Sequence, residues 1–172
     1  AVALGLVIAA TAAMAAPAGS QEFTVVSAEF DSDRQFVVRQ GTSTSTRYSV
    51  GNSGFIPVVT YLEPGSDAVD IQPRELRVGP QSVGNATLTL SAPPETGVYR
   101  RYVSEHRYLA LLPQSVIRTL YGIHPWLPVA VIDILIAVPF YVVGIVVLGG
   151  GYVRSRTRDA PSWLGRLRRR YL

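Results

Sequence analysis

The sequence contains no cysteine and no lysine. Without cysteine, no disulfide can hold a domain together outside the cell, so any folded part depends on its hydrophobic core. Without lysine, all sixteen basic residues are arginine, and no serine–lysine catalytic pair is available. The GxSxG and HExxH motifs are also missing. We therefore identify no catalytic residue, no cofactor-binding residue and no metal ligand, and leave open whether the chain belongs to an enzyme.

The positive charge of the chain is confined to its last residues. The whole chain has a formal net charge of +4, yet residues 21–107 carry ten acidic residues and eight arginines, a net charge of −2. Residues 154–172 carry one aspartate and seven arginines, namely Arg154, Arg156, Arg158, Arg166, Arg168, Arg169 and Arg170. Because the polar region itself is not basic, we do not expect it to bind nucleic acid.

Two apolar segments flank the polar region. Residues 127–149 are long enough to cross a bilayer, and the arginines that follow resist translocation and interact favourably with anionic lipid. They predict a cytoplasmic tail at residues 154–172 and an extracytoplasmic position for the polar region. The first segment, residues 1–17, is shorter. It predicts either a transmembrane helix truncated at its N-terminus, which we favour, or a signal peptide cleaved after Ala15. The expected location is the cell membrane, with several spans and lipid as a partner.

Residues 21–108 show short alternating segments separated by glycine and proline turns. In one of them, Tyr48 and Val50 alternate with Arg47 and Ser49, the period of two that is typical of a half-buried strand. Seven or eight such segments without a helical stretch predict a mainly β protein. The expected fold class is an immunoglobulin-like antiparallel β-sandwich between two transmembrane helices.

The segment 109–124 has a different pattern. Val116, Ile117, Leu120 and Tyr121 recur at helical spacing, and Pro113 is well placed to begin a helix. A short amphipathic helix beside a membrane span commonly lies among the lipid head groups, and Trp126 just before the span supports an interface there. We predict an interfacial amphipathic helix.

Four single residues are candidates for more specific roles. Asp133 lies within the second apolar segment, where an ionisable group indicates helix pairing, unless it is shallow enough to reach the outer head groups. Asn85 begins an Asn-x-Thr sequon, which permits glycosylation outside the cytoplasm. His106 and His124 have no third ligand at a metal-binding spacing, so a surface or interfacial role is favoured for both.

Two stretches resemble a known protein family. The runs IQPRELRVGPQSVGNATLTLSAPPETGVYRR, residues 71–101, and SEHRYLALLPQSVIRTLYGIHPWLPVAVIDILIAVPFY, residues 104–140, look like the C-terminal extension of signal peptidase I proteins of halophilic archaea. In that family the catalytic serine and histidine lie in an earlier domain, whose motifs this sequence does not contain. The runs YSVGNSGFIPV, residues 48–58, and APPETGVY, residues 92–99, resemble immunoglobulin-like modules of prokaryotic cell envelopes.

The resemblance implies a membrane-anchored extracytoplasmic module that forms the non-catalytic C-terminal part of an archaeal type I signal peptidase. Such a module would help to process exported preproteins, with secreted preproteins or envelope proteins as partners. The alternative is a free-standing cell-surface structural or adhesion protein that binds envelope partners through sheet edges or loops.

Overall fold

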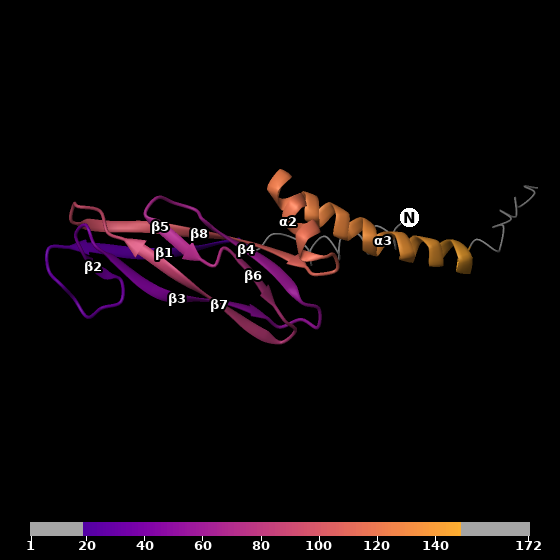
Figure 1. The fold of residues 1–172 in the computed structure, drawn as a ribbon, viewed down its shortest axis with the longest axis horizontal. Helices are drawn as coiled ribbons and strands as arrows, with labels where there is room; N and C mark the ends of the chain where they lie inside the picture. Colours follow the sequence, from indigo (N-terminus) through magenta and orange to yellow (C-terminus); the bar gives the residue numbers. More distant parts are fainter. Residues whose placement is uncertain (1–18, 149–172) are drawn as a thin grey trace, which may run out of the picture. The chain divides into compact units, whose positions relative to one another are not determined.

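The computed structural model describes residues 19–148, which contain eight strands followed by two helices (Figure 1). The strands are β1 (Ser20–Ala28), β2 (Val37–Arg39), β3 (Ser43–Asn52), β4 (Val58–Pro64), β5 (Val69–Gln72), β6 (Glu75–Val78), β7 (Ser82–Ser91) and β8 (Gly97–Leu109). The helices are α2 (Gln114–Ile123) and α3 (Leu127–Leu148). The chain divides into two compact units, residues 1–138 and 139–172. All strands, α2 and the first turns of α3 belong to the first unit.

The strands form two sheets. One has five strands in the order β2-β1-β8-β4-β6, and the other has three in the order β3-β7-β5. Every pair is antiparallel except β1 with β2, where Val26 lies opposite Val37 in a parallel pair. The long strand β8 occupies the centre of the larger sheet, between β1 and β4. In the smaller sheet β7 pairs along its whole length with β3.

One hydrophobic core lies between the two sheets. The alternating residues predicted to face inward do so: Tyr48 and Val50 of β3 are buried together with Leu88 and Leu90 of β7. The larger sheet contributes Val25, Leu62 and Val103, all with no exposed surface. Two facing sheets with one shared core form a β-sandwich. The immunoglobulin-like sandwich predicted from the sequence is confirmed for the β region, with one parallel pair that the sequence did not indicate.

Strand β4 is covered on both faces. Val58 and Leu62 point into the core between the sheets, whereas Val59 and Tyr61 belong to a second cluster on the outer face. Ile117 of α2 and Val129 and Ile132 of α3 complete that cluster. The molecule therefore has a third layer, in which α2 and the beginning of α3 lie on the outer face of the larger sheet.

Among the described residues, one helix is long and apolar enough to cross a membrane. This is α3, over Leu127–Val146, with a mean hydropathy of 2.6. The other predicted span, residues 1–17, and the arginine tail, residues 154–172, lie outside the described residues. The prediction of two transmembrane helices is therefore not confirmed.

The core between the sheets can be tested with Leu88→Ala in the full chain in detergent. Leu88 has no exposed surface, so truncation leaves a cavity and should lower the free energy of unfolding by about 2–5 kcal/mol. Urea unfolding followed by the circular dichroism of the sheets measures this loss. The matched control is Val83→Ala on the same strand, because Val83 is 62% exposed. Equal effects of the two substitutions would show that β7 does not pack as described.

Candidate functional site

The outer face of the larger sheet carries a cluster that we call the aromatic junction, defined by Tyr61, Tyr108, Tyr121, Ile117, Val129 and Ile132. The rings of Tyr61 on β4 and Tyr121 on α2 are stacked, with 4.1 Å between centroids and 11° between planes. Tyr108 on β8 meets both of them edge-on, at 6.0 Å and 5.9 Å. Stacked and edge-on pairs are the favoured geometries of aromatic rings. Three tyrosines from three elements thus form one packed group.

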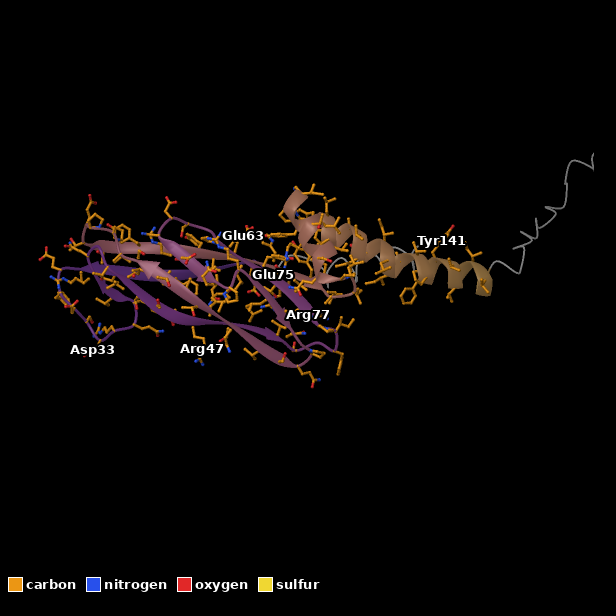
Figure 2. All side chains as sticks on the ribbon, viewed as in Figure 1. Asp33, Arg47, Glu63, Glu75, Arg77 and Tyr141 are labelled. Carbon is orange, nitrogen blue, oxygen red and sulfur yellow. The ribbon has the colours of Figure 1, made fainter. Side chains whose placement is uncertain are left out.

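A rim of polar groups surrounds the rings. Glu75 of β6 accepts hydrogen bonds from the Tyr61 hydroxyl at 3.2 Å, from Gln114 Nε2 at 2.6 Å and from Arg118 Nε at 2.8 Å. The last two donors lie on α2, so one carboxylate ties the helix to the sheet. Figure 2 shows Glu75 and Glu63 on the sheet next to α2. The Tyr121 hydroxyl donates to Glu63.

Burial and these hydrogen-bond partners shift the pKa values of the tyrosines and of Glu75. Burial, assisted by the charge and hydrogen bond of Glu75, raises the pKa of Tyr61 to about 12. Burial also raises the pKa of Tyr108 and, together with Glu63, that of Tyr121. For Glu75, burial acts to raise the pKa, but hydrogen bonds from Arg118 and Gln114 and the charge of Arg118 outweigh it and lower the pKa. At neutral pH the Tyr61 hydroxyl therefore stays protonated and donates a hydrogen bond to Glu75, which stays charged.

The junction also holds the beginning of α3. The Tyr108 hydroxyl donates to the carbonyl oxygen of Pro125 at 2.7 Å, in the turn between the helices. Val129 and Ile132 pack against the tyrosines with 4% and 0% of their surface exposed. Ile136 is half-buried against the same cluster, whereas Ile134 and Leu135 are 62% and 46% exposed and Val138 is 53% exposed. The first turns of α3 are thus fixed to the sandwich by both packing and hydrogen bonding.

The chemistry of the junction is structural. Its hydroxyls are already engaged with carboxylates or a carbonyl, and their pKa values lie above the ordinary value, which disfavours a tyrosinate base at neutral pH. His106 packs against Tyr121, with 5.6 Å between ring centroids, and its Nε2 lies 3.8 Å from Glu63. Within residues 19–148, no group of three His, Cys, Asp or Glu side chains could hold a metal ion. The arrangement fastens helices to a sheet.

Besides His106, the structure describes the other three residues that the sequence suggests for specific roles, namely Asp133, Asn85 and His124. Asp133 lies half-buried between the buried Ile132 and the exposed Ile134, and its role in helix pairing stays a prediction. Asn85 lies within β7 rather than in a turn. It is exposed and accepts a hydrogen bond from Ser49 at 3.0 Å. Glycosylation there also stays a prediction. His124 is exposed at the end of α2. The arginines of the tail lie outside the described residues.

Helix α2 covers residues 114–123 of the segment 109–124, and part of its apolar face is occupied by protein. Ile117 has no exposed surface and Tyr121 is half-buried against the sheet, whereas Val116 and Ile123 are 40% and 70% exposed. Its amphipathic pattern therefore reflects packing on β4 and β8. Contact of the exposed side with lipid head groups, as predicted for residues 109–124, stays a prediction.

Sequence reasoning missed the junction itself. Its signal was the run VVTYL, residues 58–62, in which all five residues are buried. Apolar residues at both even and odd positions of a strand, here interrupted only by Thr60, indicate cover on both faces. The spacing of Ile117 and Tyr121, four residues apart on α2, marks the matching face of the helix.

Comparison with solved structures finds several similar domains. The chain is similar to SSP-19, an MSP-domain-like protein of Caenorhabditis elegans, with 14% identity, a TM-score of 0.37 and coverage of 48% of this chain and 77% of that one. It is similar to WR4, a C. elegans MSP family member, with 7% identity, a TM-score of 0.37 and coverage of 48% and 76%. It is also similar to the seventh PapD-like domain of human CEP192, with 11% identity, a TM-score of 0.35 and coverage of 52% and 72%.

These domains are MSP or PapD-like sandwiches of the immunoglobulin type. At such TM-scores they support no inference about function, and the fold assignment rests on the sheet order and core described above. No protein-family model and no curated protein matches the sequence. None of these findings relates the chain to signal peptidase I.

We predict that the free energy of unfolding falls at alkaline pH, because the junction buries protonated tyrosine side chains. Tyr61 has a folded-state pKa of about 12, while an unfolded tyrosine ionises near pH ~10. Its contribution is therefore fully present below pH ~10 and is lost as the pH rises towards ~12, at up to about 1.4 kcal/mol per pH unit. Denaturant unfolding of the full chain in detergent between pH ~9 and ~12 measures it. Tyr61→Phe should reduce the slope, and an unchanged slope would contradict the assignment.

Proposed function

We propose that the chain is a membrane-anchored module in which an immunoglobulin-like sandwich is held in a fixed orientation relative to its membrane helix. The aromatic junction carries this proposal. A flexible tether would leave the helix and the sandwich without shared contacts, whereas here Val129 and Ile132 of α3 are buried against Tyr61 and Tyr108 of the sheet. The attachment favours a role in which the direction of the domain relative to the bilayer matters, such as positioning a neighbouring protein.

The charge pattern supports an orientation for this module. The seven arginines of residues 154–172 follow the apolar run in the sequence, which favours a cytoplasmic tail and an extracytoplasmic sandwich. The uncovered part of α3 supports the position of the bilayer. Most apolar side chains from Ile134 to Val146 are exposed, although Ile136 still packs against the junction, and the apolar sequence runs on to Val153, just before Arg154. Residues 134–153 match the length of ~20 residues that a span needs.

For the biological role we propose, on sequence resemblance alone, the non-catalytic C-terminal part of an archaeal type I signal peptidase. Residues 71–101 and 104–140 carry that resemblance. A sandwich fixed to a membrane helix suits this role, because a peptidase that acts at the membrane surface needs its exported substrates presented at a constant height. The module itself would supply no catalytic group.

A free-standing surface module is the second candidate, and strand β3 favours it. Among the described strands, β3 is a sheet edge of ten residues, whereas the edges formed by β2, β5 and β6 have three, four and four. Natural sheets keep exposed edges short unless another chain pairs with them, and a long edge can accept an extended segment as an added strand. An envelope protein is the partner this candidate requires.

The DNA upstream of the Ala1 codon separates the two candidates. An in-frame domain with a peptidase serine and histidine supports the signal peptidase, and a start codon close to Ala1 supports the surface module. Sequencing this DNA requires no purified protein. Its result decides whether a preprotein or an envelope protein is tested as the partner.

The membrane anchor is tested by Val143→Arg combined with Ile145→Arg. Both side chains are more than half exposed, so the substitutions do not disturb packing in the protein. Each arginine near the centre of a span costs about 2.5–3.5 kcal/mol of insertion. The proteins compared, namely the double variant, its control and the unsubstituted chain, all lack residues 1–17, so that the first predicted span cannot hold them on lipid. The double variant should then lose most of its flotation with lipid vesicles. Val98→Arg, at a residue of β8 that is 68% exposed, is the control and should float like the unsubstituted chain. Equal flotation of all three proteins would refute the anchor.

A further inference from the structure

We propose that the sandwich touches the lipid head groups a second time, through the loop between β3 and β4. This inference rests on the proposed function, because it requires α3 to be in the bilayer. The loop comprises residues 53–57, and it carries Phe55, 85% exposed, and Ile56, 40% exposed. Phe55 is the most exposed of the large apolar side chains on the sandwich. An aromatic residue at the tip of a loop is costly in water unless something else covers it.

The loop is held rigidly with Phe55 outward. The buried side chain of Asn52 donates from Nδ2 to the carbonyl oxygens of Ile56 and Gly79, both at 2.9 Å. Its Oδ1 accepts from the Gly54 amide at 3.0 Å. The Gln81 amide also donates to the Gly54 carbonyl oxygen, at 3.1 Å. Three of these hydrogen bonds hold the backbone of the loop on both sides of Phe55, and the fourth holds Asn52 to residue 79.

The loop lies at the end of the sandwich from which the helices leave (Figure 1). Val58, directly after the loop, pairs with Leu109 at the end of β8 and with Val78 at the end of β6. The Ala110 amide donates to the Pro57 carbonyl oxygen at 2.8 Å. Four connecting segments thus gather at this end: residues 53–57, 79–81, 110–113 and, through the bond from Tyr108 to Pro125, residues 124–126.

The two ends of the sandwich differ in charge. The four segments at the α3 end contain no charged residue, yet they include Phe55, Ile56, Leu111, Leu112 and Trp126. The loops at the opposite end are residues 29–36, 65–68 and 92–96, and they contain Glu29, Asp31, Asp33, Asp67 and Glu95 with a single arginine. Figure 2 shows Asp33 at that far end of the sandwich. Anionic head groups repel the acidic end and accept the uncharged one.

The neighbouring side chains suit the head-group layer rather than a folded partner. Trp126 is 56% exposed and Leu111 is 37% exposed, and tryptophan concentrates at membrane interfaces. Between the loop and the end of β8 lies an open hollow of about 420 Å³, lined by Phe55, Ile56, Val58, Tyr108, Leu109 and Arg107 among others. Apolar walls with an arginine beside them fit lipid, because acyl carbon adjoins phosphate at the boundary between the acyl chains and the head groups. Trp126 directly precedes α3, the helix that we place in the bilayer.

The absence of cysteine makes this contact directly measurable. Phe55→Cys, Phe30→Cys and Val143→Cys each give the full chain one thiol for a nitroxide label, and all three positions are more than half exposed. Each labelled chain is reconstituted into vesicles of phosphatidylcholine and phosphatidylglycerol. Electron paramagnetic resonance then compares collisions with oxygen, which dissolves in the bilayer, and with a water-soluble nickel chelate. Phe30, 67% exposed in the loop after β1, is the matched control.

The label at position 55 should lose its collisions with the chelate and keep those with oxygen, as the label at 143 should, while the label at 30 keeps the chelate collisions. Chelate access at 55 equal to that at 30, with position 143 immersed, would overturn the second contact and leave the anchor intact. Shielding of position 55 from both reagents would overturn it in favour of a second copy of the chain. Chelate access at 143 would overturn the anchor, and the second contact with it.

Discussion

The contact between Tyr61 and Tyr121 is the interaction on which the arrangement of the layers depends. Tyr61 lies on β4, and the opposite face of β4 packs in the core of the sandwich. The stacked rings therefore fix α2 to a strand that the core already holds in place. Tyr108 extends the contact to the turn before α3. The hydroxyls could not be buried without acceptors, and Glu63 and Glu75 provide them from the same sheet. The sheet therefore supplies both the apolar surface and the acceptors that α2 needs.

The two faces of the larger sheet consequently make different kinds of contact. Its inner face meets the smaller sheet through aliphatic side chains such as Val25, Leu62 and Val103, which pack without directional demands. Its outer face uses aromatic rings with polar tips, whose hydrogen bonds restrict α2 to one position. The first kind of contact supplies most of the buried apolar area, and the second supplies specificity of docking. The same strand, β4, serves both because its residues alternate between the faces.

Much of this architecture could be predicted from local patterns. The alternation in residues 43–52 and the glycine and proline turns predict the strands, and the spacing in residues 114–123 predicts α2. Residue patterns do not say what an amphipathic face packs against. Ile117 and Tyr121 were assigned to lipid, although the sheet covers them, because the covering residues on β4 lie more than fifty positions away in the sequence. Phe55 escaped notice for the same reason, since only the pairing of Val58 with Leu109 brings its loop to the helices.

Proline 139 gives the anchor a mechanical property. It lies inside α3, where its ring removes one backbone donor and interrupts the helical ladder, and the division between the two compact units falls at the same residue. The turns of α3 before Pro139 pack against the sheet, whereas the large apolar side chains from Phe140 to Val146 are exposed. Bending is therefore cheapest at one place. If α3 spans the bilayer as we propose, thinning or curving of the membrane would bend the helix most easily at Pro139 and leave its first turns packed on the sheet.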